Sequence, residues 1–173
     1  MAALFQGFRC DVLIRVGELK DSSLIARKLA ETRRVVAATP GYWKKYGQPN
    51  KPEDLKNHNC LTYSHLSSGN TWHMTNTAKK EHVVQPTGNL TSNSGEVLLE
   101  AALQGLGVVN LPAWMVGSDI VEGRLLEVMV NYAQPGPSVH AIYPQGRYLS
   151  AKVRVFVDFL ANHFKERPLA KLV

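Results

Sequence analysis

Cysteine is scarce in this chain, which has only Cys10 and Cys60 among its 173 residues. The two lie far apart in the sequence and show none of the short spacings that hold metal ions. A pair of free thiols is typical of proteins from a reducing compartment. We therefore expect no disulfide and no metal site, and we predict that both thiols pack as small apolar side chains.

Long hydrophobic runs are also missing. No stretch approaches the roughly 20 apolar residues that a membrane-spanning helix needs. The first residues, MAALFQGFRCDVLIRVG, have Arg9 and Asp11 where a signal peptide would have a cleavage site after a longer apolar core. The sequence therefore predicts a cytoplasmic protein with no membrane partner. With 45% hydrophobic and 20% charged residues, it has the composition of a globular protein.

The common catalytic and nucleotide-binding motifs are absent as well. The chain has no GxSxG, HExxH, GxxxxGK[ST] or GxGxxG sequence. No two of its histidines are two or four positions apart, so none forms a helical or strand metal pair. These histidines are His58, His65, His73, His82, His140 and His163. The sequence therefore favours a protein that is not an enzyme and has no cofactor, and a surface or core role for each histidine.

The charge balance is basic. Lys and Arg number 20 against 14 Asp and Glu, which gives a net charge of +6. Half of the basic residues fall between Arg9 and Lys51. This bias fits a nucleic-acid surface, a site for a small anionic ligand, or a solvated basic face. The sequence has no zinc-finger spacing, no aromatic RNA-binding strand and no helix-turn-helix with a basic second helix. Its motifs therefore do not favour the nucleic-acid surface over the other two interpretations.

Strand-like and helix-like segments alternate along the chain, which predicts an α/β protein. Short helices are expected from Pro40 to Gly47 and over residues 51–58, and a closing amphipathic helix after Ser150. Residues 59–65, 71–75 and 82–91 are predicted to form antiparallel strands. A further helix is predicted over residues 113–123. The buried face of the closing helix is predicted to be Val153, Phe156, Val157, Leu160 and Phe164. The other predicted strands are residues 11–16, 24–29, 33–39, 108–112, 124–129 and 138–144.

The helix after residue 94 has the clearest signals. Leu98, Ala101, Ala102 and Gly105 follow the spacing of one buried stripe. Asn93 followed by Glu96 predicts a capping arrangement at the start of the helix. Gly107 is expected to adopt the left-handed backbone conformation that ends it. The strand 108–112 comes next, so the segment predicts a βαβ unit in a parallel or mixed sheet.

A polar cluster, TSNS at residues 91–94, precedes this helix. Free backbone N–H groups and the positive end of the helix dipole make such a position suitable for a carboxylate or another anion. In open α/β sheets ligands lie beyond the carboxyl ends of strands, which is where this cluster falls. The alternative is that these residues only cap the helix and form a turn.

Four blocks together carry a family resemblance. They are DVLIRVGELKDSSLIARKLAETRRVVAATPGYW, PEDLKNHNCLTY, GNLTSNSGEVLLEAALQGLGVVNLPAWMVGSDIVEGRLLEVM and VHAIYPQGRYLSAKVRVFVDFLANHF. In this order and spacing they resemble the effector-binding domain of LysR-type transcriptional regulators, from about Phe8 to Phe164. The resemblance implies a fold like type 2 periplasmic binding proteins, with two α/β lobes, two crossing strands and a small effector in the cleft between the lobes. It assigns residues 1–39 and 131–173 to the first lobe and 40–130 to the second.

The resemblance also implies the partners and the site. Family members begin with a winged helix-turn-helix, a linker helix and a first βαβ segment, none of which precedes MAALFQG, so the first lobe is expected to be incomplete and DNA to be bound only through that absent part. A homodimer or higher homo-oligomer is expected, with a small effector that is a carboxylate or an aromatic molecule. The resemblance places effector-binding residues at Arg15, Val16, Gly17, Tyr63, Ser64, Asn93, Ser94, Asn110 and Leu111, and the hinge at Thr39 and Pro40.

The leading hypothesis is therefore an effector-sensing domain of a bacterial transcriptional regulator. Two alternatives remain open, a solute-binding protein of the same fold and a truncated regulator that does not bind DNA. A small hydrolase or transferase is disfavoured because no nucleophile and base are paired in the sequence.

Overall fold

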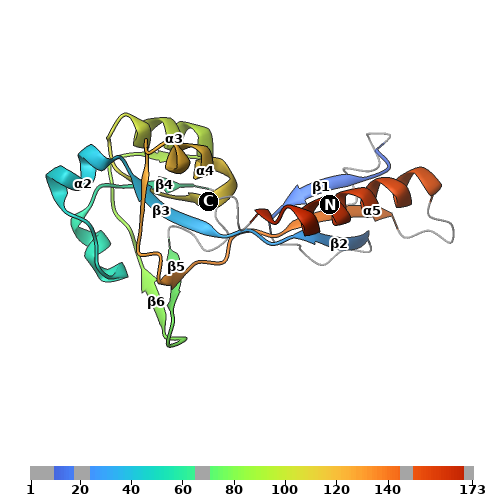
Figure 1. Cartoon of the computed structure of the whole chain (residues 1–173), viewed down its shortest axis with the longest axis horizontal. Helices are drawn as coiled ribbons and strands as arrows, with labels where there is room; N and C mark the ends of the chain where they lie inside the picture. Colours follow the sequence, from blue (N-terminus) through green and yellow to red (C-terminus); the bar gives the residue numbers. More distant parts are fainter. Residues whose placement is uncertain (1–9, 18–23, 65–70, 145–149, 170–173) are drawn as a thin grey trace. The chain divides into compact units, whose positions relative to one another are not determined.

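The computed structural model describes residues 10–17, 24–64, 71–144 and 150–169. They form two compact units (Figure 1). The first unit holds the described residues up to Thr32 and from Gly136 onward, and the second holds Arg33–Pro135. The sequence placed these boundaries after residues 39 and 130. The difference has a physical reason: residues 34–38 form a strand whose hydrogen bonds are all made within the second unit, so they belong with its sheet.

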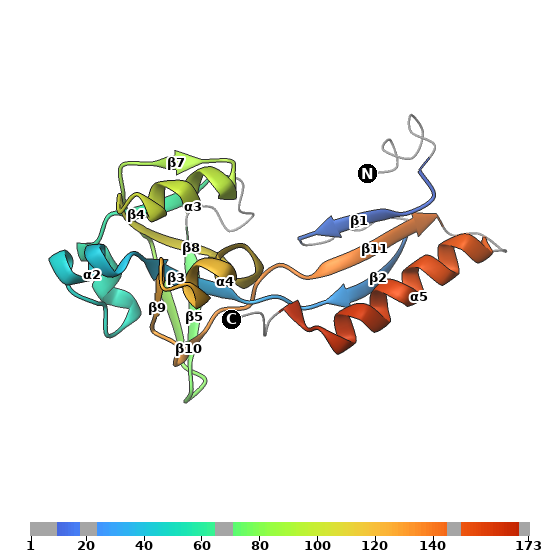
Figure 2. The same ribbon diagram turned by 45° about the horizontal axis from the view of Figure 1, so that its top comes forward.

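The first unit is an antiparallel sheet with one covering helix. Its strand order is β1 (Leu13–Val16), β11 (Val139–Pro144), β2 (Leu24–Ala30), and helix α5 (Ala151–Glu166) packs against one face (Figure 2). All four elements fall on predicted segments. Because β1 pairs only with β11, its other edge has no strand partner among the described residues.

The core of the first unit confirms most of the predicted helix stripe. Val153 and Val157 are buried against the sheet, and Leu160 and Phe164 pack beside them. Phe156 was predicted to belong to the same stripe, which is wrong because its side chain is 46% exposed. On a helix with 3.6 residues per turn, Phe156 lies at the margin of the stripe that Val153 and Val157 define, outside the contact with the sheet.

The second unit is built on a mixed five-stranded sheet. β4 runs parallel to its neighbours β7 and β8, and β3 runs antiparallel to β8 and β9. The prediction of a parallel or mixed sheet is therefore confirmed. The prediction that residues 59–65 form an antiparallel strand is wrong, because β4 runs in the same direction as both strands beside it. The order is β7 (Thr91–Ser92), β4 (Cys60–Tyr63), β8 (Val108–Pro112), β3 (Arg34–Ala38) and β9 (Leu126–Val128).

Each face of this sheet is covered by a different layer (Figures 1 and 2). Helices α3 (Gly95–Leu103) and α4 (Ala113–Val121) pack on one face around Leu61, Val109 and Leu111. The other face packs against Trp43, Trp72 and Met74. The elements of that second layer are α2 (Pro40–Tyr46), the 3-10 helix η1 (Pro52–Asn57) and an antiparallel sheet of β5 (Trp72–Asn76), β6 (Glu81–Val84) and β10 (Tyr132–Ala133).

The ends of α3 differ by one or two residues from the prediction. Ser94, and not Asn93, is the N-cap, and its hydroxyl oxygen accepts from the backbone N–H of Val97. The left-handed residue after the helix is Gly105, with φ +75°, and not Gly107. Gly107 is needed for a different reason: a Cβ there would lie 2.3 Å from the backbone oxygen of Asn59, closer than atoms can pack.

No helix among the described residues is long and apolar enough to cross a membrane.

Candidate functional site

Three parallel strands of the second unit, β7, β4 and β8, end at one edge of the sheet. Tyr63 lies opposite Ser92 in this register, and the backbone N–H of Ser64 donates to the carbonyl of Ser92 at 2.9 Å. The sheet therefore brings the predicted residues Tyr63 and Ser64 next to the start of α3, which carries Asn93 and Ser94. This is the edge at which ligands bind in open α/β sheets.

Ser94 is already engaged within the protein. Its hydroxyl accepts from the backbone N–H of Val97 at 3.3 Å and donates to the carboxylate of Glu96 at 2.7 Å. Its backbone N–H donates to the hydroxyl of Ser92 at 3.1 Å. The contacts of Ser94 are thus those of a helix cap. Asn93 is exposed, and its side chain makes no hydrogen bond with the residues that the structure describes.

Glu96 places a carboxylate at this helix start. The hydrogen bond from Ser94 lowers the pKa of the Glu96 carboxyl below its ordinary value, and a bond from its own backbone N–H acts in the same direction. A negative charge is favourable here because the helix dipole is positive at its N-terminus. An anionic ligand that binds to Ser94 must therefore displace the Glu96 carboxylate, which is exposed and free to rotate away.

The two predicted residues on β8 have different environments. Leu111 is 2% exposed and packs in the core under α3 and α4. Asn110 is 6% exposed and faces the opposite side of the sheet. Its side-chain amide donates to Oε1 of Gln134 at 2.8 Å, and its backbone carbonyl accepts from the guanidinium of Arg34 at 2.7 Å.

The predicted residues Arg15, Val16 and Gly17 belong to the first unit. Arg15 lies opposite His140, while Val16 is half exposed. Gly17 has φ +131° and donates its backbone N–H to the carbonyl of Ser138 at 3.0 Å, which ends β1 in a turn that favours glycine.

The predicted hinge residues lie inside the second unit. Thr39 is the N-cap of α2 and accepts from the backbone N–H of Tyr42 at 3.1 Å, and Pro40 is the first residue of that helix. The chain passes between the units at Thr32 to Arg33 and at Pro135 to Gly136. The position of these passages makes them the candidates for a hinge.

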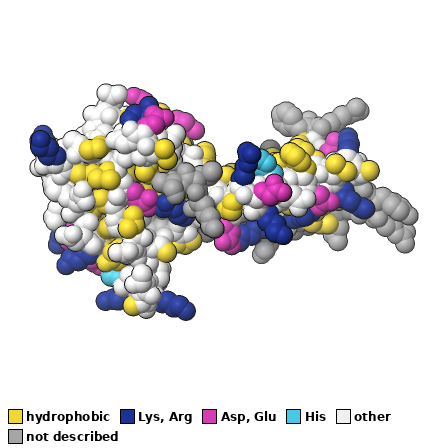
Figure 3. Space-filling view, viewed as in Figure 1, with side chains coloured by type: hydrophobic (Ala, Val, Ile, Leu, Met, Phe, Trp, Pro, Cys, Tyr) yellow, Lys and Arg dark blue, Asp and Glu magenta, His cyan; other side chains and the backbone are white. Residues whose placement is uncertain are grey.

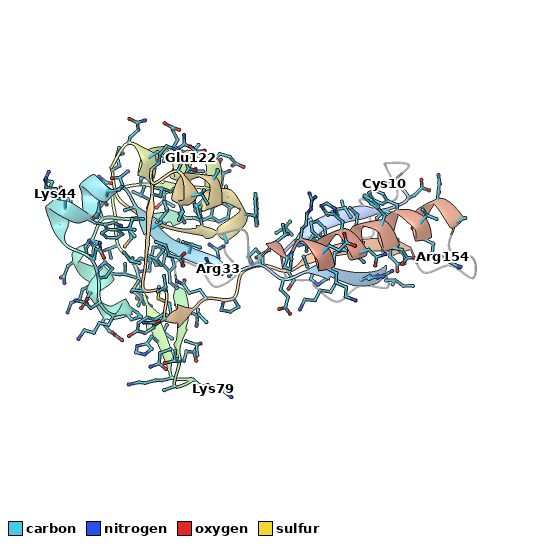
Figure 4. The ribbon with its side chains drawn as sticks, in the orientation of Figure 1. Cys10, Arg33, Lys44, Lys79, Glu122 and Arg154 are labelled. Atoms are coloured by element: carbon cyan, nitrogen blue, oxygen red, sulfur yellow. The ribbon has the colours of Figure 1, made fainter. Side chains whose placement is uncertain are left out.

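Sequence reasoning did not single out a cavity of about 450 Å³ in the second unit. Arg33, the residue directly before β3, marks its position (Figure 4). The signal that could have found it is a pair of arginines directly before the fully apolar strand VVAA, where the second arginine must be partly buried. The residues that line it are Arg33, Arg34, Glu127, Val130, Tyr132, Ala133, Gln134 and Pro135.

Three basic residues of the N-terminal part, Arg27, Lys28 and Arg33, form ion pairs within the described part of the chain. Arg27 pairs with Asp158, and the guanidinium of Arg33 forms two hydrogen bonds with the carboxylate of Glu127, at 2.6 and 3.1 Å. The face drawn in Figure 3 shows Lys and Arg interspersed with acidic side chains. Among the described residues no cluster of three or more His, Cys, Asp or Glu could hold a metal ion.

The sheet order, the covering helices and the strand-end site define the class of the protein, an α/β binding domain of the periplasmic-binding-protein type. Comparison with known families agrees: residues 1–165 match the family described as LysR substrate binding domain. The chain belongs to this family and is an effector-binding domain of the kind found in LysR-type regulators.

Several relatives are similar along most of the chain. The HTH-type transcriptional regulator CrgA of Neisseria meningitidis is 36% identical over 157 residues, which cover 89% of this chain and 51% of CrgA. The HTH-type transcriptional activator TtdR of Escherichia coli is 35% identical over 158 residues, or 91% of this chain and 50% of TtdR. The chain thus spans about half the length of the curated relatives it matches.

Solved structures show the same fold. The CrgA regulatory domain of Neisseria meningitidis superimposes with a TM-score of 0.75 at 33% identity, covering 90% of this chain and 76% of that one. The full-length Vibrio cholerae virulence activator AphB gives a TM-score of 0.77 at 29% identity, covering 90% of this chain and 52% of AphB. The fold and family predicted from the sequence are therefore confirmed.

Proposed function

We propose that this chain senses a small anionic effector for a bacterial transcriptional regulator and performs no catalysis. The observation that carries the proposal is the edge at which β7, β4 and β8 end together, because it gathers Tyr63, Ser64 and Ser94 where binding domains of this architecture hold their ligands. The family match over residues 1–165 supports the same conclusion.

The regulator acts on DNA through a segment outside this chain, which spans only half of its relatives. Within the proposal it works in the cytoplasm as a homo-oligomer. An effector that binds one arrangement of the two units better than another changes the population of the arrangements by the difference in affinity, and the DNA-binding segment responds to that change.

The test uses a carboxylate at the helix start. In Ser94→Asp the new side chain can still cap α3, so the free energy of unfolding is expected to change little. Its charge repels an anionic effector and competes for the same backbone N–H groups, so the effector affinity is expected to fall at least about tenfold. A thermal-shift screen of small carboxylates identifies the effector, and calorimetry measures its affinity.

Thr77→Asp is the matched control, because it adds the same charge at an exposed turn of the β5–β6 hairpin. It is expected to keep the wild-type affinity. Equal affinity of wild type and Ser94→Asp for a confirmed anionic effector would reduce Ser94 to a helix cap and remove this edge from the effector site.

A further inference from the structure

Arg34 is a partly buried cation without an acidic partner in the part of the chain that the structure describes. Among those residues its guanidinium makes one hydrogen bond, from Nη1 to the backbone carbonyl of Asn110 at 2.7 Å, and no ion pair. Its neighbour Arg33, in contrast, is paired with Glu127. The surrounding protein removes part of the water around the guanidinium, and this burial lowers the pKa of Arg34. A desolvated charge of this kind is normally compensated by a counter-ion.

Gln134 offers a second free donor beside it. Its side chain is 6% exposed, and its Oε1 accepts from the amide of Asn110 at 2.8 Å. This bond orients the Gln134 amide, and the two N–H donors of its Nε2 have no acceptor among the described residues. Gln134 is fixed further by its backbone carbonyl, which accepts from the backbone N–H of Arg34 at 3.0 Å.

Both side chains line the cavity of about 450 Å³, and their polar atoms there are donors. The one carboxylate of the lining belongs to Glu127 and is occupied by both nitrogens of the Arg33 fork. The rest of the wall is apolar, from Val130, Ala133 and Pro135, with the ring of Tyr132. The cavity thus combines a site for one negative charge with room for a small apolar body.

We propose that this cavity binds a small monocarboxylate with an apolar or aromatic body, the carboxylate accepting from Arg34 and Gln134 and the body packing against Val130 and Tyr132. A guanidinium and an amide N–H₂ offer a planar set of donors that matches the two oxygens of a carboxylate. The proposal goes beyond the proposed function, because the residues that line this cavity do not include Tyr63, Ser64 or Ser94. It rests on the proposed function only for its biological role.

The probe is phenylacetate, with the uncharged phenylacetamide of nearly the same shape as its matched ligand. Titrations of ¹⁵N-labelled protein, followed by NMR, are expected to show phenylacetate binding with shifts centred on residues 33–34 and 130–135. Phenylacetamide is expected to bind at least about tenfold more weakly, because it loses the charge-assisted bonds. Equal binding of the two probes would overturn the proposal, and so would the absence of phenylacetate binding at millimolar concentration.

Two variants test the residues themselves. Arg34→Gln is expected to lower the affinity for phenylacetate at least about tenfold, whereas Arg154→Gln, which removes an exposed charge from α5, is expected to keep it. Gln134→Glu supplies Arg34 with a counter-ion inside the cavity. This variant is expected to fold with undiminished thermal stability and to lose phenylacetate binding, so the test does not depend on whether Arg34→Gln folds.

The outcomes separate this proposal from the proposed function. If phenylacetate binds equally well to Gln134→Glu and wild type, the cavity assignment is overturned. The effector test with Ser94→Asp stands independently of that result. If Ser94→Asp leaves effector binding unchanged while Arg34→Gln and Gln134→Glu abolish phenylacetate binding, the cavity stands and the strand-end site falls.

Discussion

The side-chain amide of Asn110 donates a hydrogen bond of 2.8 Å to Oε1 of Gln134, with both residues 6% exposed. This bond links β8 to the segment through which the chain leaves the second unit. Because neither group can exchange its partner for bulk water, the bond also sets the orientation of the Gln134 amide.

Asn110→Ala is expected to destabilise the protein by about 1–3 kcal/mol, because it leaves Oε1 of Gln134 buried without a donor. Urea unfolding measures the change. Gln104→Ala is the control, since the Gln104 side-chain amide donates a hydrogen bond to the Glu100 carboxylate at the exposed C-terminal end of α3. The loss of this bond is expected to cost less than about 0.5 kcal/mol. Equal effects of the two substitutions would show that the Asn110 bond contributes no more than a surface contact.

The cap of α3 gives a second prediction. Ser94→Ala is expected to cost about 1 kcal/mol because the N–H of Val97 loses its acceptor. Asn93→Ala is expected to be nearly neutral, since the exposed Asn93 side chain caps nothing. Thermal unfolding of both variants checks the assignment. A larger loss for Asn93→Ala than for Ser94→Ala would restore Asn93 as the cap.

The burial of His58 is expected to make the stability of the protein depend on pH. His58 is 8% exposed, its ring lies beside Tyr42 and Trp43, and its Nδ1 has no hydrogen-bond partner among the described residues. Burial lowers the pKa of His58, while the charge of Asp54 opposes that shift and is the weaker effect. The unfolded state therefore binds the proton more readily, and the free energy of unfolding is expected to fall as pH decreases from the ordinary histidine pKa of about 6.5 toward the lower folded value.

The variant His58→Gln isolates this contribution from the other histidines. Urea unfolding of wild type and variant at pH 7.5 and 5.5, values chosen to bracket about 6.5, is expected to show a smaller pH effect in the variant. The carboxyl groups of Glu53 and Glu96, whose pKa values are lowered by hydrogen bonds from His82 and Ser94, act in a separate and more acidic window. An identical pH dependence in both proteins would show that His58 gains its proton in the folded state as easily as in the unfolded chain.

Helix α5 exposes an apolar strip on the side away from its sheet. The exposed fractions are 69% for Val155, 46% for Phe156 and 62% for Phe159. Strips of this kind promote association with other chains because contact removes apolar surface from water. We expect this chain to self-associate, and we expect the double variant Phe156→Ser with Phe159→Ser to shift it toward monomer.

Sedimentation velocity over a range of concentrations measures the association. Val121→Ser provides the control, since Val121 is 78% exposed on α4 in the other unit. A wild-type chain that stays monomeric at every concentration would contradict the prediction.

Most secondary structure could be predicted because its signals are local. Pro40 and Gly47 bound α2, and the apolar spacing of α5 survives in the structure apart from Phe156. The parallel direction of β4 could not be predicted from residues 59–65, because a strand's direction depends on which distant segment lies beside it. For the same reason the unit boundary follows the hydrogen bonds of β3 and lies before this strand, whereas the family resemblance placed it after residue 39.

The sequence by itself determined the family, the α/β class and the polar cluster before α3, because each depends on residue identities in a fixed order. Only the tertiary structure decided that Ser94 is engaged with Glu96 and that no acidic side chain in the described part of the chain pairs with Arg34. Whether a side chain has a partner depends on residues brought together from distant parts of the chain, as Arg34, Asn110 and Gln134 are. The sequence can propose which groups are able to bind an anion, but the folded chain determines which of them remain free to do so.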